Sequence, residues 1–223
     1  MRVVCISDTH LAGPEIEIPD GDILIHSGDH TFQGTLLQLT KAGAWFSSLP
    51  HKWKITIPGN HDRMFEKEEF LARVSFGEGL DGVRILIDQE IEVEGLQIWG
   101  SPWTPRYGNG WAFQLDPGTE HWKKIPEGLD ILITHGPPFG VLDRVRGQHV
   151  GDKALLTELG RAEPRYHVFG HIHDGHGEFS AGGVHFVNAA VLDDAYAVTY
   201  KPVVLDISPK GDMMKVNRGG GSE

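Results

Sequence analysis

The chain has 223 residues, of which 39% are hydrophobic and 23% are charged, the balance of an ordinary globular protein. Its formal net charge of -11 argues against a protein that wraps long nucleic acid or coats an anionic membrane, because both surfaces favour an excess of lysine and arginine. Cys5 is the only cysteine, and no signal peptide or membrane-spanning stretch is recognisable, so we expect a cytoplasmic protein without an internal disulfide.

The first half of the chain alternates short β-branched segments with amphipathic ones, which is the pattern of βαβ units around a parallel sheet. Apolar runs predict strands at residues 2–7, 23–27 and 54–58. Between the last two, residues 36–49 have apolar side chains at helical spacing and stop at a proline, which cannot continue a helix. A second helix is expected at residues 66–75.

From residue 84 onward the pattern changes to RILID, EIEVEG and LQIWGS, separated by Asp and Gly residues of the kind that join antiparallel strands. A mixed sheet, or two sheets, is therefore expected. Residues 101–128 and 136–151 are rich in Pro and Gly without a stable period. Long irregular loops of this kind usually form functional rims or lids.

The last part of the chain adds the strand-like runs ILIT and HVF, with a helix expected between them at residues 153–162. Two or three further strands are expected within residues 177–208. Because the sequence has no internal repeat and no break in composition, we expect a single domain over residues 1–208. The tail at residues 209–223 is expected to be flexible.

Polar motifs follow nearly every one of these apolar runs. In an open α/β sheet the ligand crevice lies outside the carboxyl ends of the strands, so the motifs are expected to meet there. One such motif alone is usually a turn or a helix cap, but the ordered set points to a single dinuclear metal site. The motifs are Asp8-Thr-His10, Gly28-Asp29, Gly59-Asn60-His61-Asp62, His135 and Gly170-His171-Ile-His173.

The motifs supply carboxylate, imidazole and amide ligands, which suit Mn, Fe or Zn, and they contain no thiolate. Because a carboxylate has two oxygens, Asp29 can bridge two ions. One ion is then expected to bind Asp8, His10, Asp29 and His173, and the other Asp29, Asn60, His135 and His171.

Two divalent cations against two carboxylates leave a local charge of about +2, which suits a phosphate ester. A metal-bridging hydroxide would then attack phosphorus while both cations polarise the phosphoryl oxygens. The leaving alkoxide needs a proton, and His61 is the expected general acid because it neighbours a ligand yet is not required as one. Asp62 is expected to orient the His61 ring and to favour the imidazolium.

The motif set D-x-H, G-D, G-N-H-D, H and G-H-x-H resembles that of the calcineurin-like metallophosphoesterase superfamily over about residues 3–208. The resemblance implies an α/β fold in which two mixed β-sheets pack as a sandwich flanked by helices. It also implies the ligand roles and the acid role given above.

Four further segments resemble the small metallophosphoesterase-domain-containing group related to vertebrate brain proteins. They are Gly100-Ser-Pro-Trp103, Thr134-His-Gly-Pro-Pro138, His167-Val-Phe-Gly-His-Ile-His173 and Val187-Asn-Ala189. This closer resemblance implies nucleotide-type diester or monoester substrates. Some members of the group have glycine in place of the first histidine of G-H-x-H and are impaired, whereas this chain keeps His171, which implies a complete second metal site.

Residues beside the motifs or in the irregular segments are candidates for contact with the substrate. Trp103 and Trp111 are placed to form a rim on which a nucleobase could stack, and Arg106 could meet a phosphate there. The candidates for substrate contact are His30, Arg63, Trp103, Arg106, His149 and His176.

Several histidines outside the motifs have simpler explanations. His26 and His167 fall inside apolar runs, so we expect hydrogen-bonded core residues there. His51 and His121 have polar neighbours in the sequence and are expected to be solvated.

The sequence therefore predicts a dinuclear metal-dependent phosphoesterase that acts on small nucleotide-type or similar phosphodiesters. A phosphomonoesterase or a Ser/Thr protein phosphatase is the alternative, although protein phosphatases of the superfamily typically add arginines near the second and third motifs and only Arg63 lies near here. A non-catalytic module that binds a nucleotide or a partner is a lesser alternative, because such relatives usually lose ligands or the equivalent of His61.

Overall fold

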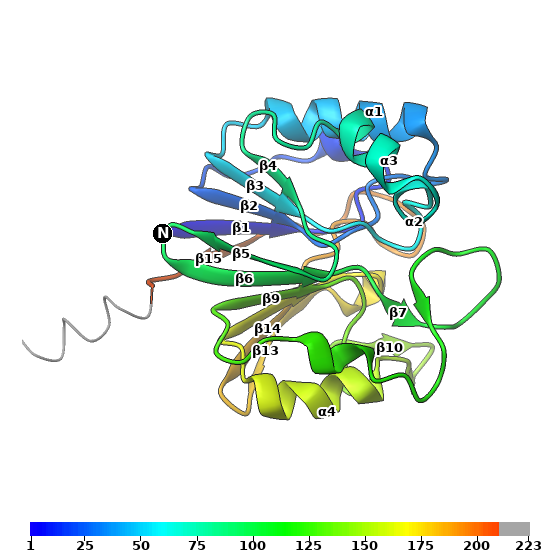
Figure 1. The fold of residues 1–223 in the computed structure, drawn as a ribbon, viewed down its shortest axis with the longest axis vertical. Helices are drawn as coiled ribbons and strands as arrows, with labels where there is room; N and C mark the ends of the chain where they lie inside the picture. Colours follow the sequence, from blue (N-terminus) through cyan, green and yellow to red (C-terminus); the bar gives the residue numbers. More distant parts are fainter. Residues whose placement is uncertain (210–223) are drawn as a thin grey trace, which may run out of the picture.

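Two β-sheets lie face to face in the computed structural model, which describes residues 1–209, and helices cover their outer faces (Figure 1). In the first sheet, β1 to β4 run parallel and β15 is antiparallel at one edge. Its strands, in the order in which they pair, are β15 (Val203–Asp206), β1 (Arg2–Ile6), β2 (Ile23–His26), β3 (Trp53–Thr56) and β4 (Val83–Ile85). Parallel strands covered on both faces are apolar throughout, which explains the unbroken Val and Ile runs in β1 and β2.

The second sheet has a parallel centre and an antiparallel strand at each edge. Its strands, in the order in which they pair, are β13 (Gly177–Ala181), β14 (Val184–Asn188), β12 (Tyr166–Phe169), β9 (Ile131–Thr134), β6 (Leu96–Ser101) and β5 (Gln89–Val93). Both sheets mix parallel and antiparallel pairs, so the expected α/β fold of two mixed sheets flanked by helices is confirmed.

The helices lie on the outer faces of the sandwich (Figure 1). Those on the side of the first sheet are α1 (Leu36–Ser48), α2 (Met64–Lys67) and α3 (Glu69–Phe76), and α4 (Lys153–Ala162) covers the second sheet. Asp152 caps α4, since its carboxylate accepts hydrogen bonds from the backbone nitrogens of Ala154 and Leu155. The short elements are η1 (Gly13–Glu15), β7 (Thr104–Pro105), β8 (Gln114–Leu115), η2 (His121–Lys124), β10 (Arg144–Val145), β11 (Gln148–His149) and η3 (His173–Gly175).

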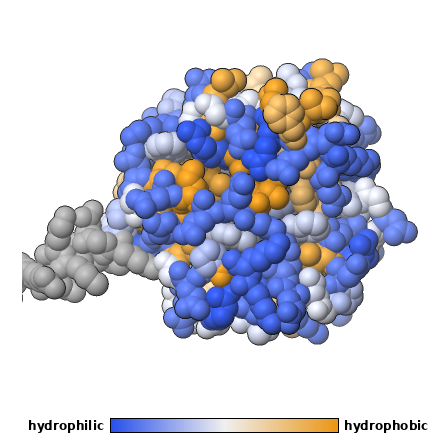
Figure 2. All heavy atoms as spheres, viewed as in Figure 1, coloured by the Kyte–Doolittle hydropathy of each residue, from blue (hydrophilic) through white to orange (hydrophobic). Residues whose placement is uncertain are grey.

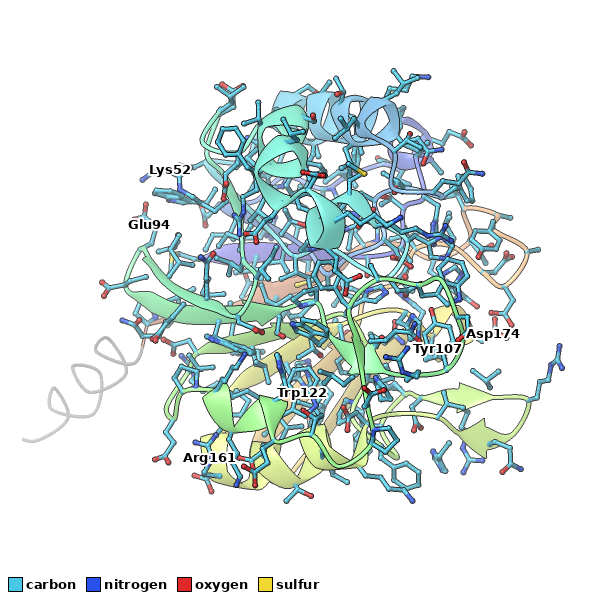
Figure 3. The ribbon with its side chains drawn as sticks, turned by 45° about the vertical axis from the view of Figure 1, so that its right-hand side comes forward. Lys52, Glu94, Tyr107, Trp122, Arg161 and Asp174 are labelled. Carbon is cyan, nitrogen blue, oxygen red and sulfur yellow. The ribbon has the colours of Figure 1, made fainter. Side chains whose placement is uncertain are left out.

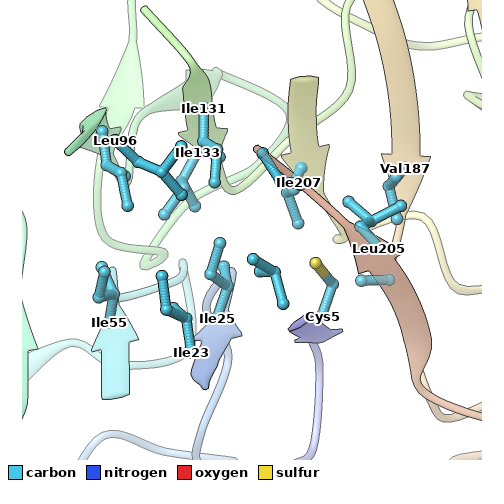
Figure 4. Close-up of a cluster of buried hydrophobic side chains, with 14 of the residues drawn as sticks. Cys5, Ile23, Ile25, Ile55, Leu96, Ile131, Ile133, Val187, Leu205 and Ile207 are labelled. Carbon is cyan, nitrogen blue, oxygen red and sulfur yellow. The ribbon is translucent and has the colours of Figure 1, made fainter. Parts of the chain in front are cut away.

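The largest hydrophobic cluster lies between the two sheets (Figure 4). Ile25 from the first sheet and Ile133 from the second are both fully buried in it, and Cys5 lies among them. Two further clusters fill the space between the first sheet and α1 and α3, and between the second sheet and α4. Because the central strands of both sheets are packed on both faces, the strand ends that carry the polar motifs are held in a fixed relation.

Apolar side chains also gather on the surface over α1 and α3 (Figure 2). The most exposed of them are Leu37 on α1 and Phe70 and Val74 on α3. We refer to these three residues as the α1–α3 patch. Within residues 1–209, none of the helices has the length and apolar character needed to cross a membrane.

The sequence-based elements agree with the structure where their signal is local. The helix expected at residues 153–162 is α4. The helix expected at residues 66–75 is instead two segments, because the backbone leaves helical geometry at Glu68, with φ of -142° and ψ of 62°. The strands expected within residues 177–208 are β13, β14 and β15, and the segment after residue 195 forms only β15. The tail predicted at residues 209–223 lies outside the described residues except for Pro209.

Candidate metal centre

The polar motifs meet beyond the carboxyl ends of β1, β2, β3, β9 and β12. Several of these residues have left-handed backbone conformations, with φ of 55° at Asp8, 42° at His10, 58° at Asp29 and 66° at His171. Residues other than glycine rarely adopt this conformation, and such strain clusters at functional sites. Asp8 and His10 thus reach the same place through a loop with left-handed backbone conformations.

The ligand atoms lie in three groups, each with its atoms within 4.8 Å of one another. The groups are Asp8, His10 and His173; His10, Asp29 and His61; and Asp29, His135 and His171. Asp29 belongs to two of them, because its Oδ2 lies 3.8 Å from His10 Nε2 and 3.4 Å from His135 Nε2. Asn60 joins the last group through its Oδ1, which lies 2.8 Å from His135 Nε2. The structure therefore brings together all seven residues expected as ligands.

Backbone carbonyls hold three of the histidines by the ring nitrogen that faces away from the centre. His10 Nδ1 lies 2.9 Å from the Thr31 carbonyl oxygen, and His135 Nδ1 lies 2.9 Å from that of Ser27. His173 Nδ1 is held in the same way by Asp193 at 2.9 Å. A proton on Nδ1 that is donated to a carbonyl leaves Nε2 free as a metal ligand.

Two atoms of the centre are buried without a hydrogen-bond partner among the described residues, namely Asp8 Oδ1 and His10 Nε2. Buried polar atoms are nearly always satisfied, so an unsatisfied carboxylate oxygen beside an unsatisfied imidazole nitrogen calls for a further partner. Both atoms are of the types that bind Mn, Fe or Zn. The residues present therefore fit divalent cations.

In the centre, the carboxylates lie beside histidines, and each type of group shifts the pKa of the other. Burial alone would raise the pKa of Asp8, but the nearby His173, whose Nε2 lies 3.6 Å from Asp8 Oδ1, and His135 lower it to about 2. The pKa of Asp29 is also lowered, because His135 outweighs the effect of burial. Burial lowers the pKa of His171 to about 3. Burial would lower the pKa of His135 and of His173. The carboxylate of Asp29 nevertheless raises the pKa of His135 to about 9, and the carboxylate of Asp8 raises the pKa of His173 to about 9. Bound cations would take the place of the protons on these two rings.

His61 stands at the edge of the ligand cluster. Its Nδ1 lies 2.7 Å from the Phe32 carbonyl oxygen, and its Nε2 lies 3.9 Å from Asp29 Oδ2. Its side chain is 13% exposed, against 1% for His10, so it is the histidine of this pair that a ligand can reach. The ring thus offers Nε2 to the centre from a partly exposed position.

Asp62 does not have the role expected from the sequence, because its carboxylate binds the backbone of two neighbouring loops. It accepts hydrogen bonds from the backbone nitrogens of Gly59, His30 and Thr31, and from Thr31 Oγ1. The group that orients the His61 ring is the Phe32 carbonyl. Asp62 contributes to that geometry only by holding the loop that carries Phe32.

Comparison with known proteins identifies the family of the chain. The family described as "Calcineurin-like phosphoesterase" matches residues 1–175. The chain belongs to the calcineurin-like phosphoesterase family. It is 42% identical over 231 residues to human "Metallophosphoesterase domain-containing protein 1", covering 92% of this chain and 71% of that protein. It is also 40% identical over 227 residues to "UPF0046 protein C25E10.12" of Caenorhabditis elegans, covering 93% of this chain and 81% of that protein.

Among solved structures, the TT1561 protein of Thermus thermophilus resembles this phosphoesterase with a TM-score of 0.59 and 11% sequence identity. The likeness covers 84% of this chain and 88% of that one. At this identity it bears on the fold alone. Family membership and the His and Asp clusters together support a metal-dependent phosphoester hydrolase.

Three of the candidates for substrate contact in this phosphoesterase pack against neighbouring aromatic side chains. His30 is 1% exposed and stacks on His26, with ring centroids 3.7 Å apart. His176 stacks on Tyr200, and its Nδ1 bonds to the carbonyl of Ala190. Trp103 packs against Phe113 and His121, with ring centroids 5.5 Å and 5.3 Å away. Their surroundings are those of packing residues.

Of the other three candidates, Arg63 is connected to the centre through Trp111. The Arg63 guanidinium lies 4.9 Å from the ring centroid of Trp111, which is itself 4.3 Å from that of His61. Arg106 pairs with Asp116 at 2.6 Å. His149 Nδ1 lies 2.5 Å from Asp143 Oδ1.

Three exposed aromatic residues that the sequence did not single out also lie at the phosphoesterase centre. Tyr196 lies against the rings of two expected ligands, with centroids 4.9 Å from His10 and 5.3 Å from His173. Phe32 stacks on His10 at 5.2 Å, and Tyr107 lies 5.2 Å from His171 (Figure 3). Nothing in the sequence marks Phe32 or Tyr107, and the left-handed φ of 60° at Tyr196 is visible only in the structure.

Two histidines expected in solvent are buried instead. His51 is 2% exposed, and its Nε2 lies 3.0 Å from the Pro19 carbonyl oxygen. The side chain of His121 is 7% exposed, and its Nε2 lies 3.0 Å from Asp88 Oδ1. Both expectations were wrong because polar neighbours in the sequence do not report the partners supplied by distant segments.

Proposed function

We propose that the protein hydrolyses small phosphodiesters of a nucleotide-type or similar kind, with two divalent cations, Mn, Fe or Zn, bound at the centre. The observation that carries this proposal is the position of Asp29, whose Oδ2 faces His10 on one side and His135 on the other. A shared carboxylate suits cations about 4 Å apart. When bound, such cations stabilise charge on the phosphoryl oxygens and make the attacking water more acidic.

The chain's own residues then orient the ester and move a proton. The Phe32 carbonyl accepts the hydrogen on His61 Nδ1, which directs Nε2 toward the centre. A proton on Nε2 is thereby placed for transfer to the oxygen of the departing alcohol, which is the task of a general acid. The carbonyls behind His10 and His135 fix the ring orientations of the ligands, so the site needs little rearrangement when it binds its substrate.

The test is turnover of bis-p-nitrophenyl phosphate and p-nitrophenyl phosphate by metal-analysed protein loaded with Mn²⁺. We expect the diester to have the higher kcat/KM, and we expect a chelator to abolish both reactions. Lack of turnover of either compound by metal-loaded protein would refute the enzymatic proposal and favour a binding module.

A phosphomonoesterase is the second candidate, and the observation in its favour is Arg63. Its Nε is buried without a hydrogen-bond partner among the described residues, and its guanidinium packs on Trp111 beside His61. Guanidinium groups bind the terminal oxygens of phosphate monoesters well. A kcat/KM for p-nitrophenyl phosphate above that for the diester, and lost in Arg63→Ala, would support this candidate.

A further inference from the structure

A cavity of about 380 Å³ opens directly beside the metal centre. This volume lies within the range of about 300–1,000 Å³ that is typical of small-molecule sites. One wall comes from the segment after β7 and the other from the β10–β11 hairpin, which lies below Tyr107 in Figure 3. We call this cavity the side groove. Its main lining residues are Pro105, Tyr107, Val145, Val150, His171 and Ile172.

Both walls of the side groove are held in place by hydrogen bonds. The fully buried carboxylate of Asp143 accepts hydrogen bonds from the backbone nitrogens of Gly140 and Gly151, each at 2.9 Å, and so fixes the base of the hairpin. On the opposite wall, the Tyr107 backbone nitrogen donates to Gln114 Oε1 at 3.0 Å. The groove is therefore preformed, which lowers the cost of binding a ligand there.

The side groove is apolar and uncharged along most of its length. Val145, Val150 and Tyr107 all line it, and they are 38%, 44% and 51% exposed. The guanidinium of Arg106, which also lines it, is paired with Asp116. Exposed apolar side chains that converge on one cavity mark a ligand site, and these favour a flat apolar occupant over an anionic one.

The position of the groove decides which part of an ester would fill it. It opens beside His171, which groups with His135, whereas His61 groups with His10 on the other side of Asp29. The leaving alcohol must lie near His61 to receive its proton. The group in the side groove is therefore the one that stays on phosphorus.

We propose that the side groove binds the non-leaving substituent of a phosphodiester, and that this substituent is an aryl ring or a heterocyclic base. The inference rests on the proposed phosphodiesterase function and goes beyond it. A phosphomonoester has no second substituent, so an occupied groove would give the enzyme both its diester preference and its substrate class.

Two diesters that share a leaving group separate the groove from the chemistry. Bis-p-nitrophenyl phosphate leaves a nitrophenyl group on phosphorus, whereas ethyl p-nitrophenyl phosphate leaves an ethyl group. In the Mn²⁺-loaded protein, Val150→Asp and Val145→Asp should each lower the ratio of kcat/KM for the first substrate to that for the second by about tenfold, because a charge replaces an apolar wall. Both residues are partly exposed, so the variants should fold. Val150→Ile should keep the ratio.

Val74→Asp is the matched control, because Val74 is 63% exposed and lies in the α1–α3 patch. The ratio of the two kcat/KM values should not change in this variant. An unchanged ratio in both groove variants would overturn the inference even if the diesters are hydrolysed. A second measurement does not need turnover: calorimetric binding of diphenyl phosphate and of diethyl phosphate, which has no aryl group, to Mn²⁺-loaded His61→Ala protein. The inference is supported if diphenyl phosphate binds more tightly than the other diester and if this difference is lost when Val150→Asp is added to His61→Ala. Equal binding of the two diesters contradicts the inference. Absence of turnover alone would refute the proposed function and leave this binding test to decide the groove.

Discussion

At the scale of single residues, the position of His61 follows from contacts with three different segments. The Phe32 carbonyl accepts the hydrogen on Nδ1, and Trp111 and His10 contact the ring with centroids at 4.3 Å and 4.7 Å. Its backbone nitrogen donates to Asp29 Oδ1 at 2.8 Å, which ties the residue to the expected bridging ligand. The ring is thus held in place without a carboxylate partner on Nδ1.

A general acid matters most when the departing group is a poor one. For His61→Ala we expect kcat to fall by about 10²- to 10⁴-fold with diphenyl phosphate, whose phenol departs poorly without a proton, and by less with bis-p-nitrophenyl phosphate. The measurement is kcat for both substrates at matched metal content. His185→Ala, a change at a histidine that bonds to Glu178 and Ser180 on the second sheet, is the control. Equal losses with the two substrates would remove His61 from the role of acid.

At the scale of elements, the irregular segment after β6 is fixed at several points along its length. The backbone nitrogen of Ala112 donates to the Asn60 carbonyl at 3.1 Å, and that of Phe113 donates to Glu66 Oε1 at 2.9 Å. These bonds attach the segment, which leaves the second sheet after β6, to the loop that contains the predicted ligand Asn60 and to the helix that follows it. Farther along, η2 is joined to the connection between β4 and β5 through His121 and Asp88. The segment is therefore a rigid rim of the centre.

The bond between Asp88 and η2 makes stability depend on pH. Burial alone would raise the pKa of Asp88, but hydrogen bonds from His121, Ser101 and Lys124 lower it to about 2. The folded-state pKa is below the unfolded value of about 3.9, so this stability is present above about pH 4 and is lost as pH falls toward 2. Because solvent screens part of this interaction, we expect Asp88→Asn to cost about 1–2 kcal/mol at pH 6 and about half of that at pH 3.

Urea unfolding of the wild type and Asp88→Asn at pH 6, 5, 4 and 3 measures this difference. Glu120→Gln is the control, because Glu120 forms an exposed pair with Lys123 and such pairs contribute little. A gap between wild type and Asp88→Asn that stays constant from pH 6 to pH 3 would contradict the assigned ionisation.

Elements were predictable from the sequence where the signal lay within the element. The helix α4 has its apolar spacing and its cap, Asp152, in one short stretch, and its limits agree with the prediction. The contacts of Asp62 and His121 were not predictable, because Thr31 lies 31 residues from Asp62 in the chain and Asp88 lies 33 residues from His121. The same holds for Tyr196, which reaches the centre through a turn that the Asp193 carboxylate stabilises by bonding Ala195, Ala197 and Thr199.

At the scale of the whole molecule, the centre joins the two sheets at the edge where their parallel strands end. The expected ligands that follow strands of the first sheet are Asp8, His10, Asp29 and Asn60, and those that follow strands of the second sheet are His135, His171 and His173. The strand-end motifs were visible in the sequence because each one follows an apolar run. Which sheet each strand joins was not, since that depends on packing between distant segments.

Cations bound by ligands from both sheets should act as a cross-link and stabilise the folded protein. A cation at about 100 times its Kd adds about 2.7 kcal/mol to the free energy of unfolding. For a chain of this size that corresponds to a rise in Tm of about 5–10 °C. We expect Mn²⁺ to raise Tm by this amount over chelator-treated protein, in a thermal melt followed by circular dichroism.

The shared ligand should carry most of that rise. Asp29→Asn keeps an oxygen that can accept the hydrogen bond from the His61 backbone nitrogen, so the fold should persist, but it loses the charge that faces both His10 and His135. We expect Mn²⁺ to raise the Tm of this variant by less than half of the wild-type value. Asp206→Asn, at an exposed carboxylate on β15, should respond to Mn²⁺ as the wild type does. If Asp29→Asn responds fully as well, the cations do not share Asp29, and the sheets are held together at this edge by their packing alone.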